Sequence, residues 1–218
     1  MSYVIHFSTP GCGTKCRENP LELVFVIDGS ESVGPENFKV VKEFVNALVD
    51  NASVSRQTTR VGVVLYSHVN MVVVGLNQLS TRDQIKTAVR SMTYLGEGTF
   101  TGSAIQTANQ VFQEARPGVR KMAVVITDGR ADERDSVKLH EAVKEAHDSN
   151  IEMFVIGVVD ESDPMNMEFM EDVFLMASDP NMEHIFLIKD FSKLPGKLSY
   201  TKLCLHCYNA AYSNALQE

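Results

Sequence analysis

The sequence predicts an α/β domain: a three-layer, doubly wound, mostly parallel six-stranded sheet with one antiparallel edge strand and helices on both faces. Short apolar runs alternate with amphipathic stretches, which is the pattern of a parallel sheet covered by helices. The chain has 218 residues, of which 44% are hydrophobic, enough for one sizeable domain with its own core. We expect this domain to span residues 16–204, with a short extension at 1–15 and a tail at 205–218.

The first half of the chain predicts three strands and three helices. Residues 21–27 form the first, buried strand, and Pro35 suits the first turn of a helix whose apolar residues recur at helical spacing to about Val49. Strands follow at 61–66 and 71–74, and the short turn between them makes the second strand an antiparallel hairpin partner. Helices then cover 81–92 and 104–115, and Arg116-Pro117-Gly118 ends the second of them.

The second half repeats the alternation of strands and helices. Strands are predicted at 122–127, 153–159 and 185–188. The helices are expected at 137–147, 169–177 and 192–203. This order implies six strands, five of them parallel, so the carboxyl ends of the parallel strands should meet at one edge of the sheet, where ligands bind in such folds.

Charge and hydropathy argue against a general nucleic-acid-binding protein and against a membrane-spanning helix. The formal net charge is −8, from 20 basic and 28 acidic residues, whereas a general nucleic-acid binder needs a basic face. No apolar run approaches the ~20 residues of a membrane-spanning helix. Residues 1–10 lack both the charged n-region and the long apolar h-region of a signal peptide, so we interpret the sequence as part of a longer chain.

The four cysteines lie at the two ends of the chain. Cys12 and Cys16 precede the first strand, and Cys204 and Cys207 follow the last helix. In a secreted chain this favours one or two disulfide bridges that tie the ends together, with Cys16–Cys204 expected first and the other two closing beside it or pairing with another chain. The alternative is a Cys₄ zinc site with His206 as a spare ligand, although these spacings match no familiar zinc pattern.

Asn51-Ala52-Ser53 is the one N-glycosylation sequon in the chain. We place Asn51 in the connection after the first helix, which should be exposed. A glycan at Asn51 is therefore expected when the chain passes through a secretory pathway.

Three separated fragments carry the candidate site. Asp28, Ser30 and Ser32 take alternate positions on the turn that leaves the first strand, Thr99 lies in a glycine-rich segment, and Asp128 follows the strand 122–127. Two carboxylates and three hydroxyls would then converge at one edge of the sheet. These are hard oxygen ligands, which suit Mg²⁺, Ca²⁺ or Mn²⁺ rather than zinc.

Each fragment also has a simpler structural interpretation. Asp28 and Ser30 could cap a helix, and Thr99 and Asp128 could be ordinary turn residues. An aspartyl-phosphate phosphatase would need a second Asp at position 30, where the chain has Ser30, and neither a P-loop nor a Gly-x-Ser-x-Gly elbow is present. The joint occurrence of all five residues favours the metal site. His68 lies in the predicted hairpin turn, and we assign it no role.

The motif Asp-x-Ser-x-Ser with a distant Thr and Asp resembles the metal-ion-dependent adhesion site of von Willebrand factor type A (vWA) domains. The resemblance runs from about Leu21 to Leu203, and the surrounding residues are similar to the extracellular-matrix branch: type VI and type XXVIII collagens, matrilins and cochlin, with type XXVIII nearest. It implies that the two serine hydroxyls bind a cation directly, with Mg²⁺ as the first candidate and Ca²⁺ or Mn²⁺ as alternatives. Thr99 would bind directly or through water, and the two aspartates would act through bridging water.

The resemblance also implies a function. An open position on the cation would bind a carboxylate of a partner, so we expect a secreted, non-enzymatic adhesion module in the extracellular matrix that binds proteins such as collagens. The alternative is a structural assembly domain without metal-mediated ligand contact. A third class is an enzyme or an intracellular chelatase-type subunit. The module would be part of a larger matrix protein, which can be oligomeric.

Charged residues beside the five candidate ligands form a predicted rim. The rim is mainly acidic, so a partner that presents one carboxylate flanked by basic residues fits it best; a solvated loop with no partner is the simpler interpretation. The rim residues are Glu31, Glu97, Arg130, Asp132 and Arg134, with Glu133 and Asp135 beside them.

Overall fold

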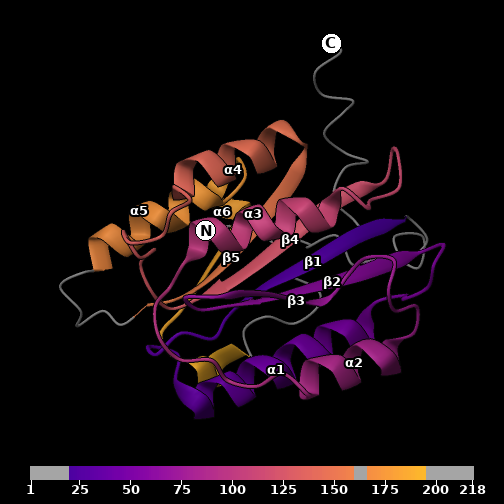
Figure 1. The fold of residues 1–218 in the computed structure, drawn as a ribbon, viewed down its shortest axis with the longest axis horizontal. Coiled ribbons are helices and arrows are strands. Elements are labelled where there is room, and N and C mark those ends of the chain that lie inside the picture. Colours follow the sequence, from indigo (N-terminus) through magenta and orange to yellow (C-terminus); the bar gives the residue numbers. More distant parts are fainter. Residues whose placement is uncertain (1–19, 160–165, 195–218) are drawn as a thin grey trace, which may run out of the picture.

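The computed structural model describes residues 20–159 and 166–194. Its centre is a six-stranded sheet with the strand order β3-β2-β1-β4-β5-β6 (Figure 1). Only the β2–β3 pair is antiparallel; the other four neighbouring pairs are parallel. The predicted fold class is therefore confirmed, including the antiparallel strand at one edge. Within the described ranges, no helix is both long and apolar enough to cross a membrane.

The strands begin at more polar residues than the sequence patterns suggested. β2, β4 and β5 each start two residues before the predicted position, because Arg60, Arg120 and Glu152 belong to strands and form ion pairs there. The strands are β1 (Leu21–Asp28), β2 (Thr59–Tyr66), β3 (Asn70–Val74), β4 (Arg120–Thr127), β5 (Ile151–Val158) and β6 (Ile185–Ile188).

Helices cover both faces of the sheet. α1 and α2 lie on one face and α3, α4 and α5 on the other (Figure 1). The helices are α1 (Gly34–Asn51), α2 (Arg82–Arg90), α3 (Thr101–Phe112), α4 (Leu139–Asp148), α5 (Asn166–Met176) and the short α6 (Asn181–His184). The sequence did not predict α6. Of the helix predicted at 192–203, the described part is a 3₁₀ turn, Phe191–Lys193, and most of the remainder lies outside the described residues.

The central strand separates two hydrophobic layers. All eight residues of β1 are buried. Phe25 and Ile27 pack with the helices α1 and α2, whereas Val24 and Val26 pack with α3, α4 and α5. Burial on both faces is typical of parallel sheets, and it fixes the register of β1 and therefore the position where Asp28 leaves the sheet.

Several predicted features fall outside the described residues or shift slightly. The four cysteines and His206 lie in the ranges that the structure does not describe, as do the proposed limits of the domain. Asn51 is the last residue of α1 rather than part of the following connection. It is exposed, and its Nδ2 donates a hydrogen bond of 2.8 Å to the carbonyl of Ala47. Its glycosylation stays a prediction.

Candidate functional site

The carboxyl ends of β1 and β4 bring the two candidate aspartates together. These strands are parallel neighbours, with Ile27 paired to Ile126, so Asp28 and Asp128 both follow at the same edge. Ser32 bridges the two segments, because its Oγ donates a hydrogen bond of 2.7 Å to Oδ1 of Asp128. The Oγ atoms of Ser30 and Ser32 are 3.0 Å apart.

The glycine-rich segment supplies the third part of the site. Gly96 N donates to the carbonyl of Gly29 at 2.9 Å, and Asp132 N donates to the carbonyl of Thr99 at the same distance. A Cβ placed on Gly129 would lie 3.4 Å from Ser32 Oγ and 3.8 Å from Thr99 Oγ1. Gly129 thus lies beside both hydroxyl-bearing segments, and the structure brings together the five residues that the sequence singled out.

Asp28 is a buried carboxylate surrounded by uncharged donors. It is 2% exposed, and its oxygens accept hydrogen bonds from Ser30 N at 2.9 Å, Thr127 Oγ1 at 2.6 Å and Tyr66 Oη at 3.3 Å. Burial raises the pKa of Asp28 above its usual value, against these hydrogen bonds, which lower it. Among the described residues, no lysine or arginine forms an ion pair with it.

Asp128 lies nearer to the surface and shows the effect of its neighbour. Burial and then repulsion from Asp28 raise the pKa of Asp128 to about 6, while the hydrogen bond from Ser32 opposes the change. Two carboxylates that repel one another lack a positive counter-charge among the described residues, and a bound divalent cation would supply it.

The donor set fits a hard divalent cation. Asp28 and Ser30 are buried behind the site, Asp128 and Thr99 are half-buried, and Ser32 is exposed, so the hydroxyl side opens to solvent. In residues 20–159 and 166–194, no cluster of three or more His, Cys, Asp or Glu side chains is placed to hold a metal ion. The candidate site has only two carboxylates, and hydroxyl oxygens would complete the ligand set.

The rim residues are more paired than their sequence suggests. Arg134 pairs with Asp132 at 2.5 Å, and its hydrogen bonds lower the pKa of Asp132 to about 2. Arg130 pairs with Glu133 at 2.7 Å and also with Glu168 of α5. Both rim arginines thus neutralise neighbouring carboxylates.

Two acidic rim residues stay exposed, and one leaves the rim. Glu31 and Glu97 are exposed at the site. Asp135, which the sequence grouped with the rim, is buried and accepts hydrogen bonds from the backbone N of Ser103 at 2.8 Å and from its hydroxyl. It therefore caps the start of α3. A Cβ on Gly102 would collide with the carbonyl of Val137, so this helix start packs closely on the segment after Asp135.

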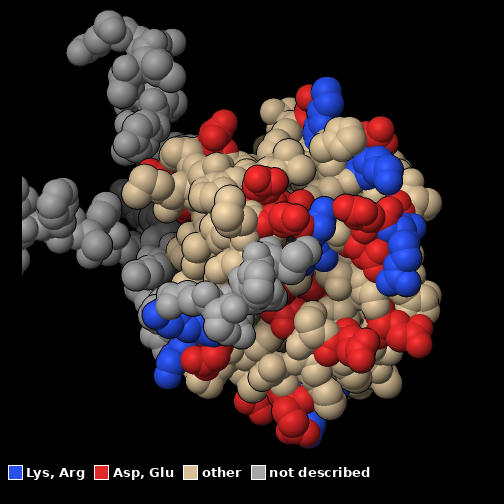
Figure 2. Space-filling view, turned by 90° about the vertical axis from the view of Figure 1, so that its left-hand side faces the viewer, with Lys and Arg blue, Asp and Glu red and all other residues tan. Residues whose placement is uncertain are grey.

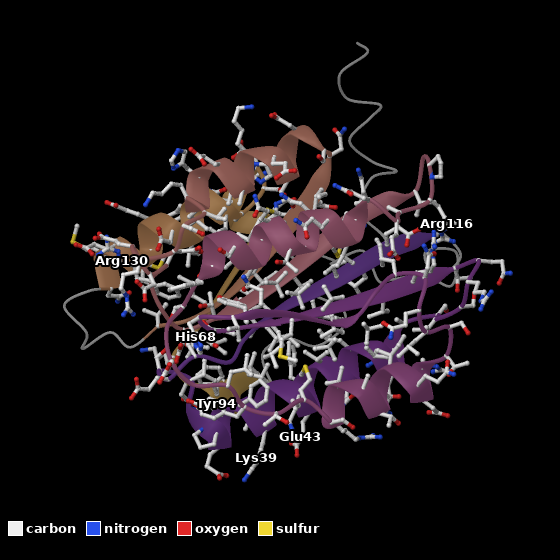
Figure 3. The ribbon with its side chains drawn as sticks, viewed as in Figure 1. Lys39, Glu43, His68, Tyr94, Arg116 and Arg130 are labelled. Atoms are coloured by element: carbon white, nitrogen blue, oxygen red, sulfur yellow. The ribbon has the colours of Figure 1, made fainter. Side chains whose placement is uncertain are left out.

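Sequence patterns missed the residues that hold the site in place. Tyr94, labelled in Figure 3, donates a hydrogen bond from Oη to the carbonyl of Ser30 at 3.0 Å. Its ring centroid lies 5.8 Å from that of Phe38. His68 also touches the site segment: its backbone N donates to the carbonyl of Glu97 at 2.9 Å, and its ring lies 3.8 Å from the Glu97 carboxylate. No local pattern marks these contacts, because they depend on the tertiary fold.

The opposite end of β1 carries a charged cluster that was also missed. Glu22 is fully buried and accepts from Arg60 at 2.9 Å and from Arg116 at 2.5 Å. Arg116 additionally donates to the carbonyls of Gln57 at 2.7 Å and Thr58 at 2.6 Å. This cluster ties the start of β1 to β2 and to the end of the segment after α3.

Comparison with known proteins agrees with this architecture. A sequence model of the von Willebrand factor type A domain matches residues 22–200. Matrilin-1 of Bos taurus is 38% identical over 190 residues, which cover 84% of this chain and 33% of matrilin-1. The collagen alpha-1(XXI) chain of Homo sapiens is 36% identical over 179 residues, 82% of this chain and 18% of that protein. The chain thus spans a third or less of these two relatives.

Solved structures show the same fold at lower identity. Proximal thread matrix protein 1 from the mussel byssus superposes with a TM-score of 0.73 at 21% identity, over 88% of this chain and 47% of that one. A second structure of that protein, described as having a zinc-occupied MIDAS motif, has a TM-score of 0.69 at 20% identity, over 86% of this chain and 47% of that one. The fold agrees with the match to the family sequence model, and the chain belongs to the von Willebrand factor type A domain family.

Proposed function

We propose that this chain is a secreted, non-enzymatic adhesion module of the extracellular matrix that binds protein ligands through a divalent cation. The observation that carries the proposal is the pair Asp28 and Asp128, two repelling carboxylates without an arginine or lysine partner among the described residues. Hydroxyls of three further residues lie beside them. The sequence similarity to matrilin-1 and to a collagen chain supports a role in the matrix.

The proposed ligands divide into two groups. Ser30 and Ser32 would bind the cation through their hydroxyls, and Thr99 would bind it directly or through water. Asp28 and Asp128 would supply negative charge from behind. Mg²⁺ is the first candidate, with Ca²⁺ and Mn²⁺ as alternatives, because all five donors are hard oxygens. The bound cation would attract a carboxylate of the partner. The five residues of this chain would hold the cation in position.

The surrounding charge limits the kind of partner. Acidic side chains are spread over the face that Figure 2 shows, and basic groups gather at a few places. The exposed Glu31 and Glu97 add negative charge at the rim, whereas Arg130 and Arg134 are already paired. A protein segment with one carboxylate flanked by basic residues would satisfy both the cation and the rim. The sequence similarity to matrilin-1 and to a collagen chain makes collagens and other matrix proteins the first partners to test.

A binding screen tests the proposal. The full chain is applied to a panel of immobilised matrix proteins, including fibrillar collagen, in Mg²⁺ and then in a chelator. We expect at least one interaction that needs Mg²⁺ and that falls at least tenfold in Asp128→Asn. Asp148→Asn is the matched control, since Asp148 is exposed on α4 and its ion pair among residues 20–159 and 166–194 is with Lys144. Binding that is unchanged by chelator and by Asp128→Asn would instead favour a structural assembly domain.

A further inference from the structure

The outer edge of β3 is open. β3 is the first strand in the sheet order, and among the described residues it is hydrogen-bonded only to β2 (Figure 1). A strand in this position presents unpaired backbone N–H and C=O groups, which form a template for another strand.

The side chains at this edge are apolar and exposed. The exposed fractions are 42% for Val69, 48% for Met71 and 51% for Val72. Successive side chains of a strand point to opposite faces, so the exposure of both Met71 and Val72 means that neither face is covered there. Val74, further along, is fully buried.

The chain segment that forms this edge carries no charged residue, and the nearby Glu114 accepts a hydrogen bond from Asn77 N beyond the end of β3. No Lys, Arg, Asp or Glu occurs from Val69 to Thr81, in a chain whose net charge is −8. Edge strands of soluble proteins are usually protected by charged residues, proline or bulges. β3 has one such feature, an extra residue at Val73, where the pairing passes from Val63–Val74 to Val64–Val72. The segment before it is left regular and uncharged.

The other edge of the sheet differs. β6 exposes Leu187 at 43%, but Glu183 and His184 precede the strand, and Lys189 and Asp190 follow it. This edge therefore has nearby charges of the kind that oppose strand pairing, and it provides an internal control.

We propose that β3 of one copy pairs antiparallel with β3 of a second copy, with Met71 and Val72 close to the two-fold axis. Two copies with net charge −8 repel each other over most of their surfaces, and the uncharged edge is where they approach with least repulsion. A two-fold arrangement lets the same patch serve both copies. This inference does not depend on the proposed cation site.

The size of the edge sets the strength of the pair. β3 has five residues, of which Met71 and Val72 are exposed and apolar, and exposed Val69 directly precedes it, so the contact falls well below the ~800 Å² per partner of a stable interface. The pair is therefore weak and reversible when the domain is alone. Because the strands are antiparallel, the two candidate metal edges face opposite directions, and a paired module would present two sites.

Sedimentation velocity tests the inference with the full chain, from about 10 μM to about 1 mM, a range in which weak interfaces are populated. We expect the weight-average sedimentation coefficient of the wild type to rise with concentration. Val72→Lys should weaken association at least tenfold and keep the circular dichroism spectrum, because Val72 is half-exposed. Leu187→Lys, at the β6 edge, should associate like the wild type.

A charge-pairing experiment makes the test specific to a β3–β3 contact. Val72→Lys and Val72→Glu should each be monomeric, and their equimolar mixture should associate again, since the two side chains would meet near the axis. A wild type that stays monomeric at every concentration would overturn the proposal. This holds even if the monomer binds an added strand peptide, because the edge would then pair with another chain and not with a second copy. So would loss of association in Leu187→Lys with retention in Val72→Lys.

Discussion

Each end of β1 buries a carboxylate, but in the part of the chain that the structure describes only the carboxylate at the start of the strand has arginine partners. At the start of the strand, fully buried Glu22 pairs with Arg60 and Arg116. At its carboxyl end, Asp28 is 2% exposed and is surrounded by hydroxyl and backbone donors, with no basic partner among the described residues. Figure 3 shows the two environments far apart, with Arg116 at one end and Tyr94 and His68 at the other.

The comparison separates a buried charge that the chain itself compensates from one that it leaves without a basic partner among the described residues. A buried carboxylate costs free energy unless it is paired. The chain supplies two guanidinium groups to Oε1 of Glu22, so the negative charge is compensated within the domain, although the buried Oε2 accepts no hydrogen bond from a described residue. Asp28 and Asp128 lack such partners within the described ranges. Burial raises the pKa of both carboxyl groups, and repulsion from Asp28 raises that of Asp128 further. A positive charge from outside the chain would stabilise Asp28 and Asp128 at the carboxyl ends of β1 and β4. This is the physical basis of the proposed cation site.

The largest effect should come from breaking the paired end. Glu22→Gln removes the charge that two arginines share, and we expect it to lower the free energy of unfolding by about 3–5 kcal/mol, the usual cost of breaking a buried pair. Urea denaturation measures this, and the loss should be equal with and without Mg²⁺. Glu43→Gln, at an exposed position of α1, is the control and should change stability by less than about 0.5 kcal/mol. A Glu22→Gln variant that also lost cation affinity would show that the two ends are coupled.

The second effect should appear at the unpaired end and only with cation. In Asp28→Asn the side chain keeps its shape, and the hydroxyls of Thr127 and Tyr66 can accept hydrogen bonds in place of donating them. At a cation concentration 100 times its Kd, the wild type should gain about 2.7 kcal/mol of stability, and Asp28→Asn should gain close to none. Without cation the variant should be at least as stable as the wild type, because an uncompensated buried charge is gone. Equal Mg²⁺ stabilisation of both proteins would contradict the assignment of Asp28.

Sequence patterns anticipated the unpaired end better than the paired one. Apolar runs identified all six strands, the inner four because they are buried on both faces and the edge strands β3 and β6 although they are partly exposed. The five candidate ligands lie close after strands or in a glycine-rich turn. Arg60 and Glu152 resembled loop residues, because charged positions interrupt an apolar run. Glu22 meets Arg60 and Arg116 at sequence separations of 38 and 94 residues. Contacts of that range depend on the topology of the sheet and leave no local signal.

The same absence of long-range signal applies to the residues that support the site. Tyr66 and Tyr94 come from different parts of the chain and touch Asp28 and the carbonyl of Ser30 respectively. A tyrosine in a buried strand and another after a helix fit many roles in a sequence. Their hydrogen bonds could be assigned only once β1, β2 and the glycine-rich segment were placed together.

A smaller effect should distinguish the two ends by pH. The pKa of Asp128 is raised from 3.8 to about 6 in the folded chain, so without cation the folded state binds a proton that the unfolded state does not hold between about pH 6 and pH 4. The contribution of Asp128 to stability therefore increases as the pH falls through this range, by at most about 2–3 kcal/mol. Saturating Mg²⁺ should remove this dependence, since it favours the ionised form.

The control for this measurement is Asp128→Asn without cation. Burial lowers the pKa of His184, but its hydrogen bonds to Glu152 and to the carbonyl of Pro180 outweigh this, so the pKa is raised overall. His184 therefore contributes stability that is present below pH 6.5 and is lost as the pH rises through its folded pKa. That contribution has the same direction and is common to both proteins. The difference between wild type and Asp128→Asn in urea denaturation from pH 4 to pH 7.5 therefore isolates the site. A difference that is constant with pH would argue against a raised pKa at Asp128.

The smallest effect should come from the exposed charges of the rim. Glu31 is exposed beside the candidate ligands, so it adds negative potential at the cation without the low dielectric that strengthens the effect of Asp28 and Asp128. Glu31→Gln should weaken Mg²⁺ binding by no more than about twofold at 0.15 M salt, and by more at low salt, where screening is weaker. Mg²⁺ titrations followed by thermal unfolding, with Glu36→Gln on α1 as the matched exposed control, measure this. A tenfold loss in Glu31→Gln that persists at high salt would mean that the cation relies on the rim, and the distinction between a buried functional pair and a solvated surround would no longer hold.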